Sequence, residues 1–124
     1  MANILIVDDD AQIRKVFRRI LEAESHEVME AADGIEGAKR FRDWPPDLVL
    51  MDIFMPEQEG LQTIREICWD FPDVKIIAIS GGGRSGRMEP LEAAEKFGAI
   101  RSLKKPISRE QLLSAVKEVL AGRT

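Results

Sequence analysis

Residues 4–9 read Ile4-Leu5-Ile6-Val7-Asp8-Asp9, four consecutive apolar residues followed at once by two carboxylates. A short apolar run of this kind is typical of a strand that is buried on both faces of a parallel sheet. Two further apolar runs are also followed directly by a polar residue: Leu48–Met51 by Asp52, and Val74–Ile79 by Ser80. We therefore expect polar, chemically capable groups at the ends of successive buried strands.

Helical patterns separate these strands. The first helix is predicted from apolar residues spaced by three, one, three and one, with Asp10 as its N-cap; they are Ile13, Val16, Phe17, Ile20 and Leu21. A weaker edge strand is expected over 28–31. The next helix begins near Asp33-Gly34, with Ile35, Ala38 and Phe41 facing the core, and ends at Trp44 before two prolines.

The second half repeats the alternation. One helix is expected after Gly60, with Leu61, Ile64 and Cys68 on its inner face. Another is expected from Pro90 to a C-cap at Gly98. A weak strand over 100–103 precedes a final helix that opens with a capping box of Ser108 and Gln111. Five strand–helix units predict an α/β, (βα)5 doubly wound domain with a five-stranded parallel sheet. Ligands of such sheets bind at the carboxyl ends of the strands.

Composition sets limits on the function. The 124 residues suit one domain, expected to span residues 1–124. A net charge of −4 argues against nucleic-acid binding by this domain, and no apolar run is long enough for a membrane span. The single cysteine permits no internal disulfide, and the N-terminus lacks the features of a signal peptide. A cytoplasmic location is the expectation.

The paired carboxylates Asp8 and Asp9 suit a metal site. Two such charges about 4 Å apart repel by about 4 kcal/mol at an effective dielectric of 20. A divalent cation removes that penalty, and Mg²⁺ favours carboxylate oxygens together with water and phosphate. Taken alone, the pair also fits an ordinary polar turn with an N-cap.

Asp52, Ser80 and Lys105 complete the candidate site. Asp52 could ligate metal or attack phosphorus to form an aspartyl phosphate, and Ser80 could donate a hydrogen bond to a phosphoryl oxygen. Lys105 could bring a positive charge to the phosphate. Strand alternation sends Lys104 and Lys105 to opposite sides, so only one of them should reach the site. Taken alone, Asp52 and Ser80 also fit ordinary turns, and Lys104-Lys105 also fits a solvated basic pair before a helix.

The ordered set of motifs resembles the response-regulator receiver domain, the phosphoacceptor part of two-component signalling. The resemblance runs nearly end to end and rests on the following residues: Ile4 to Asp9, Asp33-Gly34, Asp52, Met55-Pro56, Gly60, Ser80, Gly98-Ala99 and Lys105-Pro106. It implies a flavodoxin-like sheet with strand order 2-1-3-4-5. It also implies a phosphoacceptor signalling domain rather than an enzyme. Such a domain assists its own phosphorylation and dephosphorylation.

The resemblance further implies a role for each site residue. Asp52 would be the phosphorylated residue. Mg²⁺ would be held by Asp8, Asp9, Asp52 and the backbone carbonyl of Phe54. Ser80 and Lys105 would contact the phosphoryl group. The implied partners are a histidine kinase or phosphotransfer protein as donor, and a downstream protein or an output domain missing from this chain. The implied oligomeric state is a monomer or a phosphorylation-dependent dimer.

Two features depart from the family pattern. Ser102 stands where relatives carry an aromatic residue, three positions before the lysine, and Gly81-Gly82-Gly83 follows Ser80. A serine cannot fill the volume of a ring, so our hypothesis is that order–disorder of residues 81–88 replaces the usual side-chain switch.

Two other functions stay open at this point. A receiver-like interaction module with a silent site is compatible with Ser102 and the glycines. A Mg²⁺-dependent phosphohydrolase is less compatible, because Phe54 occupies the position of the acid–base aspartate that such enzymes use.

Overall fold

The computed structural model describes residues 2–53, 59–80, 94–95 and 98–122. Their strands are β1 (Asn3–Val7), β2 (Glu27–Ala31), β3 (Leu48–Asp52), β4 (Ile76–Ser80) and β5 (Arg101–Lys104). Their helices are α1 (Ala11–Glu22), α2 (Gly34–Asp43), α3 (Glu59–Asp70) and α5 (Arg109–Leu120). The segment expected to form the fourth helix lies mostly outside the described residues.

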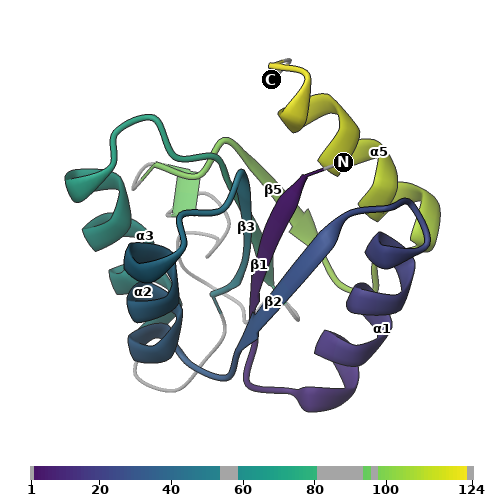
Figure 1. Cartoon of the computed structure of the whole chain (residues 1–124), viewed down its shortest axis with the longest axis horizontal. Coiled ribbons are helices and arrows are strands. Elements are labelled where there is room, and N and C mark those ends of the chain that lie inside the picture. Colours follow the sequence, from purple (N-terminus) through teal and green to yellow (C-terminus); the bar gives the residue numbers. More distant parts are fainter. Residues whose placement is uncertain (1, 54–58, 81–93, 96–97, 123–124) are drawn as a thin grey trace, which may run out of the picture.

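The strands form one parallel sheet in the order β2-β1-β3-β4-β5, which confirms the predicted fold class and strand order. The ribbon shows α1 and α5 on one face of the sheet and α2 and α3 on the other (Figure 1). Parallel strands place all their carboxyl ends along one edge. The ends of β1, β3 and β4 are therefore neighbours, although their residues are far apart in the chain.

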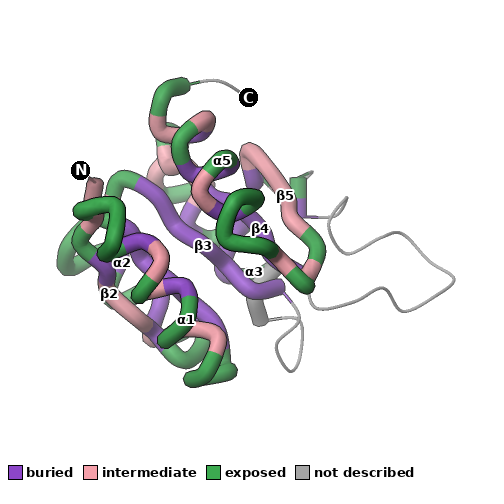
Figure 2. The backbone as a smooth tube through the Cα atoms, turned by 90° about the vertical axis from the view of Figure 1, so that its right-hand side faces the viewer, coloured by how far each residue is buried: buried purple, intermediate pink, exposed green. Residues whose placement is uncertain are grey.

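Each face of the sheet has its own apolar core. Alternate β1 residues divide between the faces, so Leu5 and Val7 pack with Phe41 and Ile64 under α2 and α3. Ile4 and Ile6 instead join the residues of α1 and α5, which include Phe17, Leu21, Leu112 and Val116. The central strand β3 is buried along its whole length (Figure 2). This two-sided burial explains the continuous apolar runs in the sequence.

The helix caps follow the sequence signals. The Asp10 carboxylate accepts from the Gln12 amide at the start of α1, and that of Asp33 accepts from the Glu36 amide at the start of α2. Ser108 and Gln111 form the predicted capping box of α5. These side chains satisfy amides that a helix leaves without partners in its first turn.

Several predictions of detail are wrong. Ile35 is 77% exposed rather than part of the core, because the inner face of α2 is formed by Ala38 and Phe41. Gly60 lies within the first turn of α3 instead of before it. The fourth strand begins at Ile76, two residues later than Val74, because the preceding residues form the turn that leaves α3.

Gly98 has the conformation expected of a helix C-cap. Its φ is +130°, and the amides of Gly98 and Ala99 both donate to the Ala94 carbonyl, at 3.1 and 3.0 Å. A Cβ at this position would lie 2.4 Å from the Cys68 Sγ on α3. Glycine is required here by the backbone and by the close approach of α3.

Within the described part of the chain, no helix combines the length and apolar character needed to cross a lipid bilayer.

Candidate functional site

The sheet edge gathers the predicted site residues. Asp8 follows β1 directly, while Asp52 and Ser80 are the last residues of β3 and β4. All three are nearly inaccessible to solvent, with exposed fractions of 2 or 3%. Buried polar groups at the end of apolar strands are costly unless they are paired. Their contacts therefore define the chemistry available at this edge.

Lys105 supplies positive charge to the two buried carboxylates. Its Nζ lies 3.2 Å from Asp8 Oδ2 and 3.8 Å from Asp52 Oδ2. The Lys105 amide also donates to the Ser80 carbonyl at 2.7 Å, which ties the residue after β5 to the end of β4. Lys104, its neighbour in the chain, is exposed. Of the two lysines, Lys105 is the one whose ammonium group the described contacts place beside these carboxylates.

A metal ion fits between three of the carboxylates. Asp8, Asp9 and Asp52 each offer one oxygen, and these oxygens lie within 4.8 Å of one another. The donor set consists of hard, anionic oxygens, which Mg²⁺ and Ca²⁺ prefer over softer ligands. Asp9 is exposed whereas Asp8 and Asp52 are buried, so the cluster is open to solvent on one side. The backbone carbonyl of Phe54, the fourth predicted ligand, lies outside the described residues.

Asp8 is held by contacts to every one of its polar atoms. Its amide donates to the Ala31 carbonyl at 3.1 Å, and its Oδ1 accepts from the Asp10 amide at 2.8 Å. Oδ2 accepts from Lys105, and the backbone carbonyl accepts from Arg14 Nη1 at 2.6 Å. Its position is therefore determined without a metal.

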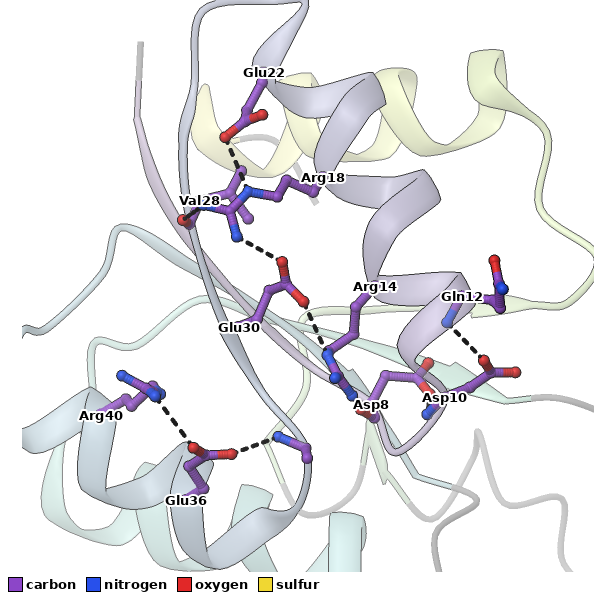
Figure 3. A network of polar contacts seen from close by, with 11 residues as sticks. Asp8, Asp10, Gln12, Arg14, Arg18, Glu22, Val28, Glu30, Glu36 and Arg40 are labelled. Atoms are coloured by element: carbon purple, nitrogen blue, oxygen red, sulfur yellow. Dashed lines mark hydrogen bonds and ion pairs between the residues drawn. The ribbon is translucent and has the colours of Figure 1, made fainter.

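Arg14 is a residue that the sequence analysis did not single out. It projects from the first turns of α1 toward the end of β1, and its Nε also pairs with Glu30 of β2 at 2.9 Å (Figure 3). Glu30 in turn binds Arg18, and this hydrogen bond is the main reason why the pKa of the Glu30 carboxyl lies below its usual range. No motif marks Arg14 or Glu30, because their pairing depends on how α1 packs over β2.

Ser102, which departs from the family pattern, and its neighbour Arg101 both have polar partners. Ser102 Oγ donates to Glu95 Oε2 at 2.7 Å, and Arg101 pairs with Glu118 of α5 at 2.6 Å. Gly81-Gly82-Gly83 and the segment 81–88, for which we expect an order–disorder change, lie outside the described residues.

Two further side chains that can titrate, His26 and Cys68, are half-buried. His26 is half-buried: its Nδ1 accepts from the Ala2 amide at 3.1 Å, and burial lowers its pKa. Cys68 is half-buried as expected, and burial raises the pKa of its thiol. His26 lies in the connection between α1 and β2, and Cys68 lies on α3. Neither contacts the carboxylate cluster through any hydrogen bond or ion pair that the described residues show.

A groove lies beside the site, between α1 and the turn after β5. It is lined by Gln12, Ile13, Val16, Phe17, Lys105, Pro106 and Ile107. Val16 is 52% exposed within it, although its α1 neighbour Phe17 is buried. Because Lys105 lines the groove and also contacts Asp8 and Asp52, the groove borders the carboxylate cluster.

Comparison with known proteins relates the whole chain to one family. The sequence model of the response regulator receiver domain matches residues 4–117. The chain is 33% identical over 120 residues to the chemotaxis protein CheY of Halobacterium salinarum, covering 97% of this chain and 98% of that protein. It is 36% identical over 121 residues to the sensor kinase CckA of Brucella abortus, covering 96% of this chain but only 12% of that longer protein.

The fold is shared with solved structures. A CheY-like response regulator receiver domain from Methanospirillum hungatei superposes with a TM-score of 0.89 at 32% sequence identity, covering 98% of this chain and 95% of that one. Similar units therefore occur both as nearly whole proteins and within longer ones.

Proposed function

The chain belongs to the response regulator receiver domain family, whose members are phosphoacceptor signalling domains of two-component systems, and from this premise we propose that Asp52 is its phosphorylated residue. The observation that carries the proposal is the position of Asp52. Its carboxylate is buried at the end of β3, with Asp8, Asp9 and Lys105 around it. Asp8 shares the burial, the cluster and the lysine, so the choice of Asp52 over Asp8 as the acceptor rests on the resemblance to the receiver family.

The proposed reaction is the transfer of one phosphoryl group. A carboxylate oxygen of Asp52 attacks phosphorus and forms a P–O bond, while the P–N bond of a phosphohistidine donor, or the P–O bond of a small acyl phosphate, breaks. The electron pair of the broken bond leaves with the donor, which takes up a proton from solvent when it is an imidazole. Hydrolysis later returns inorganic phosphate and the free carboxylate.

Asp8, Asp9 and Asp52 are the proposed holders of Mg²⁺, with the Phe54 carbonyl as a further ligand. When bound, the ion would offset the charge of the carboxylates and of the incoming phosphoryl oxygens. Within the chain, Lys105 supplies the fixed positive charge, and Ser80 supplies a hydroxyl at the neighbouring strand end. Lys105 is already between Asp8 and Asp52, so it need move little to contact a phosphoryl oxygen on Asp52.

Receiver domains act with histidine kinases and output domains. For this chain we propose a histidine kinase or phosphotransfer protein as the donor, and a downstream protein or an output domain on another part of the polypeptide as the recipient of the signal. The groove between α1 and the turn after β5 is the proposed place where the donor binds, because it opens beside Lys105. The domain, proposed to span residues 1–124, would act as a monomer or dimerise on phosphorylation.

The proposed activity is that of a switch that promotes its own phosphorylation and dephosphorylation, not of an enzyme that turns over a metabolite. Its net charge of −4 favours protein partners over nucleic acid.

The deciding experiment identifies the phosphorylated residue. The protein is incubated with Mg²⁺ and acetyl phosphate, and the product is mapped by mass spectrometry under mildly acidic conditions. We expect one base-labile phosphate on Asp52, which is lost in Asp52→Asn and strongly reduced when the metal is chelated. Asp73→Asn is the matched control, because Asp73 is exposed before β4 at the opposite edge of the sheet. A label that survives in Asp52→Asn would identify a different acceptor.

A further inference from the structure

A chain of alternating charges connects the proposed acceptor site to the outer strand of the sheet. Arg14 Nε pairs with Glu30 Oε1 at 2.9 Å, and Arg18 Nη1 pairs with Glu30 Oε2 at 2.5 Å. Arg18 also reaches Glu22 at 3.0 Å and the Val28 carbonyl at 3.2 Å (Figure 3). Both oxygens of Glu30 therefore have a cationic partner from α1.

Only one member of this network contacts the site. Arg14 Nη1 donates to the backbone carbonyl of Asp8 at 2.6 Å, while its Nε is occupied by Glu30. The Arg14 side chain is only 17% exposed, so water competes little for this contact. Arg18, one turn further along α1, binds the same Glu30 but has no contact with Asp8 among those that the described residues show.

The contact acts on the geometry of the carboxylate pair. The Asp8 carbonyl and the Asp9 amide belong to one planar peptide group. A hydrogen bond to that carbonyl therefore restricts rotation of the plane that joins Asp8 to Asp9. Asp8 is also held through its side chain, whereas Asp9 is exposed and depends on the backbone for its direction.

We propose that Arg14, oriented by Glu30, is a positioning residue that sets the Asp8–Asp9 turn for metal binding. The inference rests on the proposed function, because it assigns Asp8 and Asp9 to the Mg²⁺ site. Glu30 has two roles: it fixes the guanidinium of Arg14, and it offsets a positive charge that would otherwise oppose a cation nearby. Partners of metal ligands commonly change metal affinity by tenfold or more when they are removed.

An effect of charge and a positioning role predict opposite changes in Mg²⁺ affinity for Arg14→Gln. Arg14→Gln removes a positive charge near the site, which by itself would tighten Mg²⁺ binding. Loss of the Asp8 contact would instead weaken it. Arg18→Gln is the matched control, because it makes the same change of charge on the same helix and also removes a partner of Glu30, but leaves the Asp8 carbonyl bonded.

The experiment measures the Mg²⁺ dissociation constant by calorimetry at fixed ionic strength, together with amide hydrogen exchange at Asp10 in metal-free protein. We expect Arg14→Gln and Glu30→Gln each to weaken Mg²⁺ binding about tenfold, with the double variant no weaker than the single ones. Arg18→Gln should stay within about twofold of wild type. The Asp10 amide, which donates to Asp8 Oδ1, should exchange faster in Arg14→Gln, in Glu30→Gln and in the double variant, but not in Arg18→Gln.

Tighter or unchanged Mg²⁺ binding in Arg14→Gln would overturn the proposal, as would an equal loss in Arg18→Gln. An unchanged rate of Asp10 amide exchange in Arg14→Gln would also overturn the proposal, and this test needs no metal. Absence of Mg²⁺ binding in the wild type would instead contradict the metal site of the proposed function, and the exchange measurement distinguishes that failure from a failure of the positioning role. Denaturant unfolding of each variant excludes loss of the fold as the cause.

Discussion

At the scale of single residues, Lys105 is the group on which the metal-free site depends most. Its ammonium group lies between two buried carboxylates and forms an ion pair with each of them. Removing one partner of a buried ionic cluster leaves the other charges uncompensated, which commonly costs about 3 kcal/mol. The lysine is thus expected to serve the stability of the protein as well as its reaction.

We predict that Lys105→Met lowers the free energy of unfolding by about 3 kcal/mol in metal-free protein. Saturating Mg²⁺ should restore most of this loss, because the cation replaces the missing charge between the carboxylates. Urea denaturation with chelator and with Mg²⁺ measures both values. Lys104→Met, at the exposed neighbouring position, should change neither. Equal losses with and without Mg²⁺ would show that the lysine acts by packing instead.

Glu30 makes the free energy of unfolding depend on pH in the acid range. Hydrogen bonds from Arg18 and Arg14 hold the pKa of Glu30 below its ordinary value of 4.5. A carboxyl whose pKa is lower in the folded state stabilises the protein fully above the unfolded pKa, and this contribution is lost as the pH falls through the folded pKa.

We therefore predict that Glu30→Gln costs about 1 kcal/mol near neutral pH, and that the difference from wild type shrinks as the pH falls below about 4.5. Urea denaturation over a pH series measures the difference. Glu27→Gln is the control, since Glu27 is an exposed carboxylate of the same strand. A difference that stayed constant down to strongly acidic pH would mean that ionisation of Glu30 is not its source.

At the scale of elements, local signals and tertiary contacts contribute differently. The caps of α1, α2 and α5 follow from short motifs, because a cap is formed by residues within one turn of each other. The exposure of Ile35 does not follow from the apolar spacing of α2, because that spacing fits a helix rotated toward Ile35 as well as the one observed. The observed rotation of α2 places Gly37 against β1 of the sheet, where an added Cβ would lie 2.8 Å from a Val7 methyl.

The α5 capping box offers a quantitative test at this scale. We predict that Ser108→Ala lowers the free energy of unfolding by about 1 kcal/mol, because the Gln111 amide loses its side-chain acceptor. Ser114→Ala, an exposed position within the same helix, should cause no loss, since alanine is the better helix former. Thermal and urea unfolding compare the two variants. Equal effects would mean that the cap contributes nothing beyond helix propensity.

At the scale of the whole molecule, the groove between α1 and the turn after β5 joins two distant segments beside Lys105. If a protein donor binds there, its surface must cover Val16, whereas a small phosphodonor needs only the opening at the carboxylates. The two donors should therefore respond differently to a change in the groove.

We predict that Val16→Asp slows phosphorylation by a phosphorylated histidine phosphotransfer protein by about tenfold, corresponding to about 1.4 kcal/mol. The rate with acetyl phosphate should be unchanged, because the carboxylate cluster is not altered. Ile35→Asp is the matched control, being an exposed isoleucine on α2. A similar loss with both donors would place the effect in the site itself, and no loss with either would exclude this groove as the docking surface.

The class of fold and the set of residues at one sheet edge could be predicted from the amino-acid sequence, and the strand order from its resemblance to a family. The first two could be predicted because buried parallel strands require continuous apolar runs, and because their carboxyl ends meet at the same edge. Asp8, Asp52, Ser80 and the pair Lys104-Lys105 followed from this rule, whereas the choice of Lys105 over Lys104 came from the resemblance to the family.

The side chains that support that edge could not be predicted in this way, because their contacts are tertiary. The contact of Arg14 with the Asp8 carbonyl, the pairing of Glu30 with both arginines and the half-buried His26 join residues from different elements. Such contacts depend on how α1 and β2 are rotated and placed against one another, and neither periodicity nor local motifs specify that placement. Packing of the two cores on the sheet sets it, and with it the geometry of the proposed acceptor site.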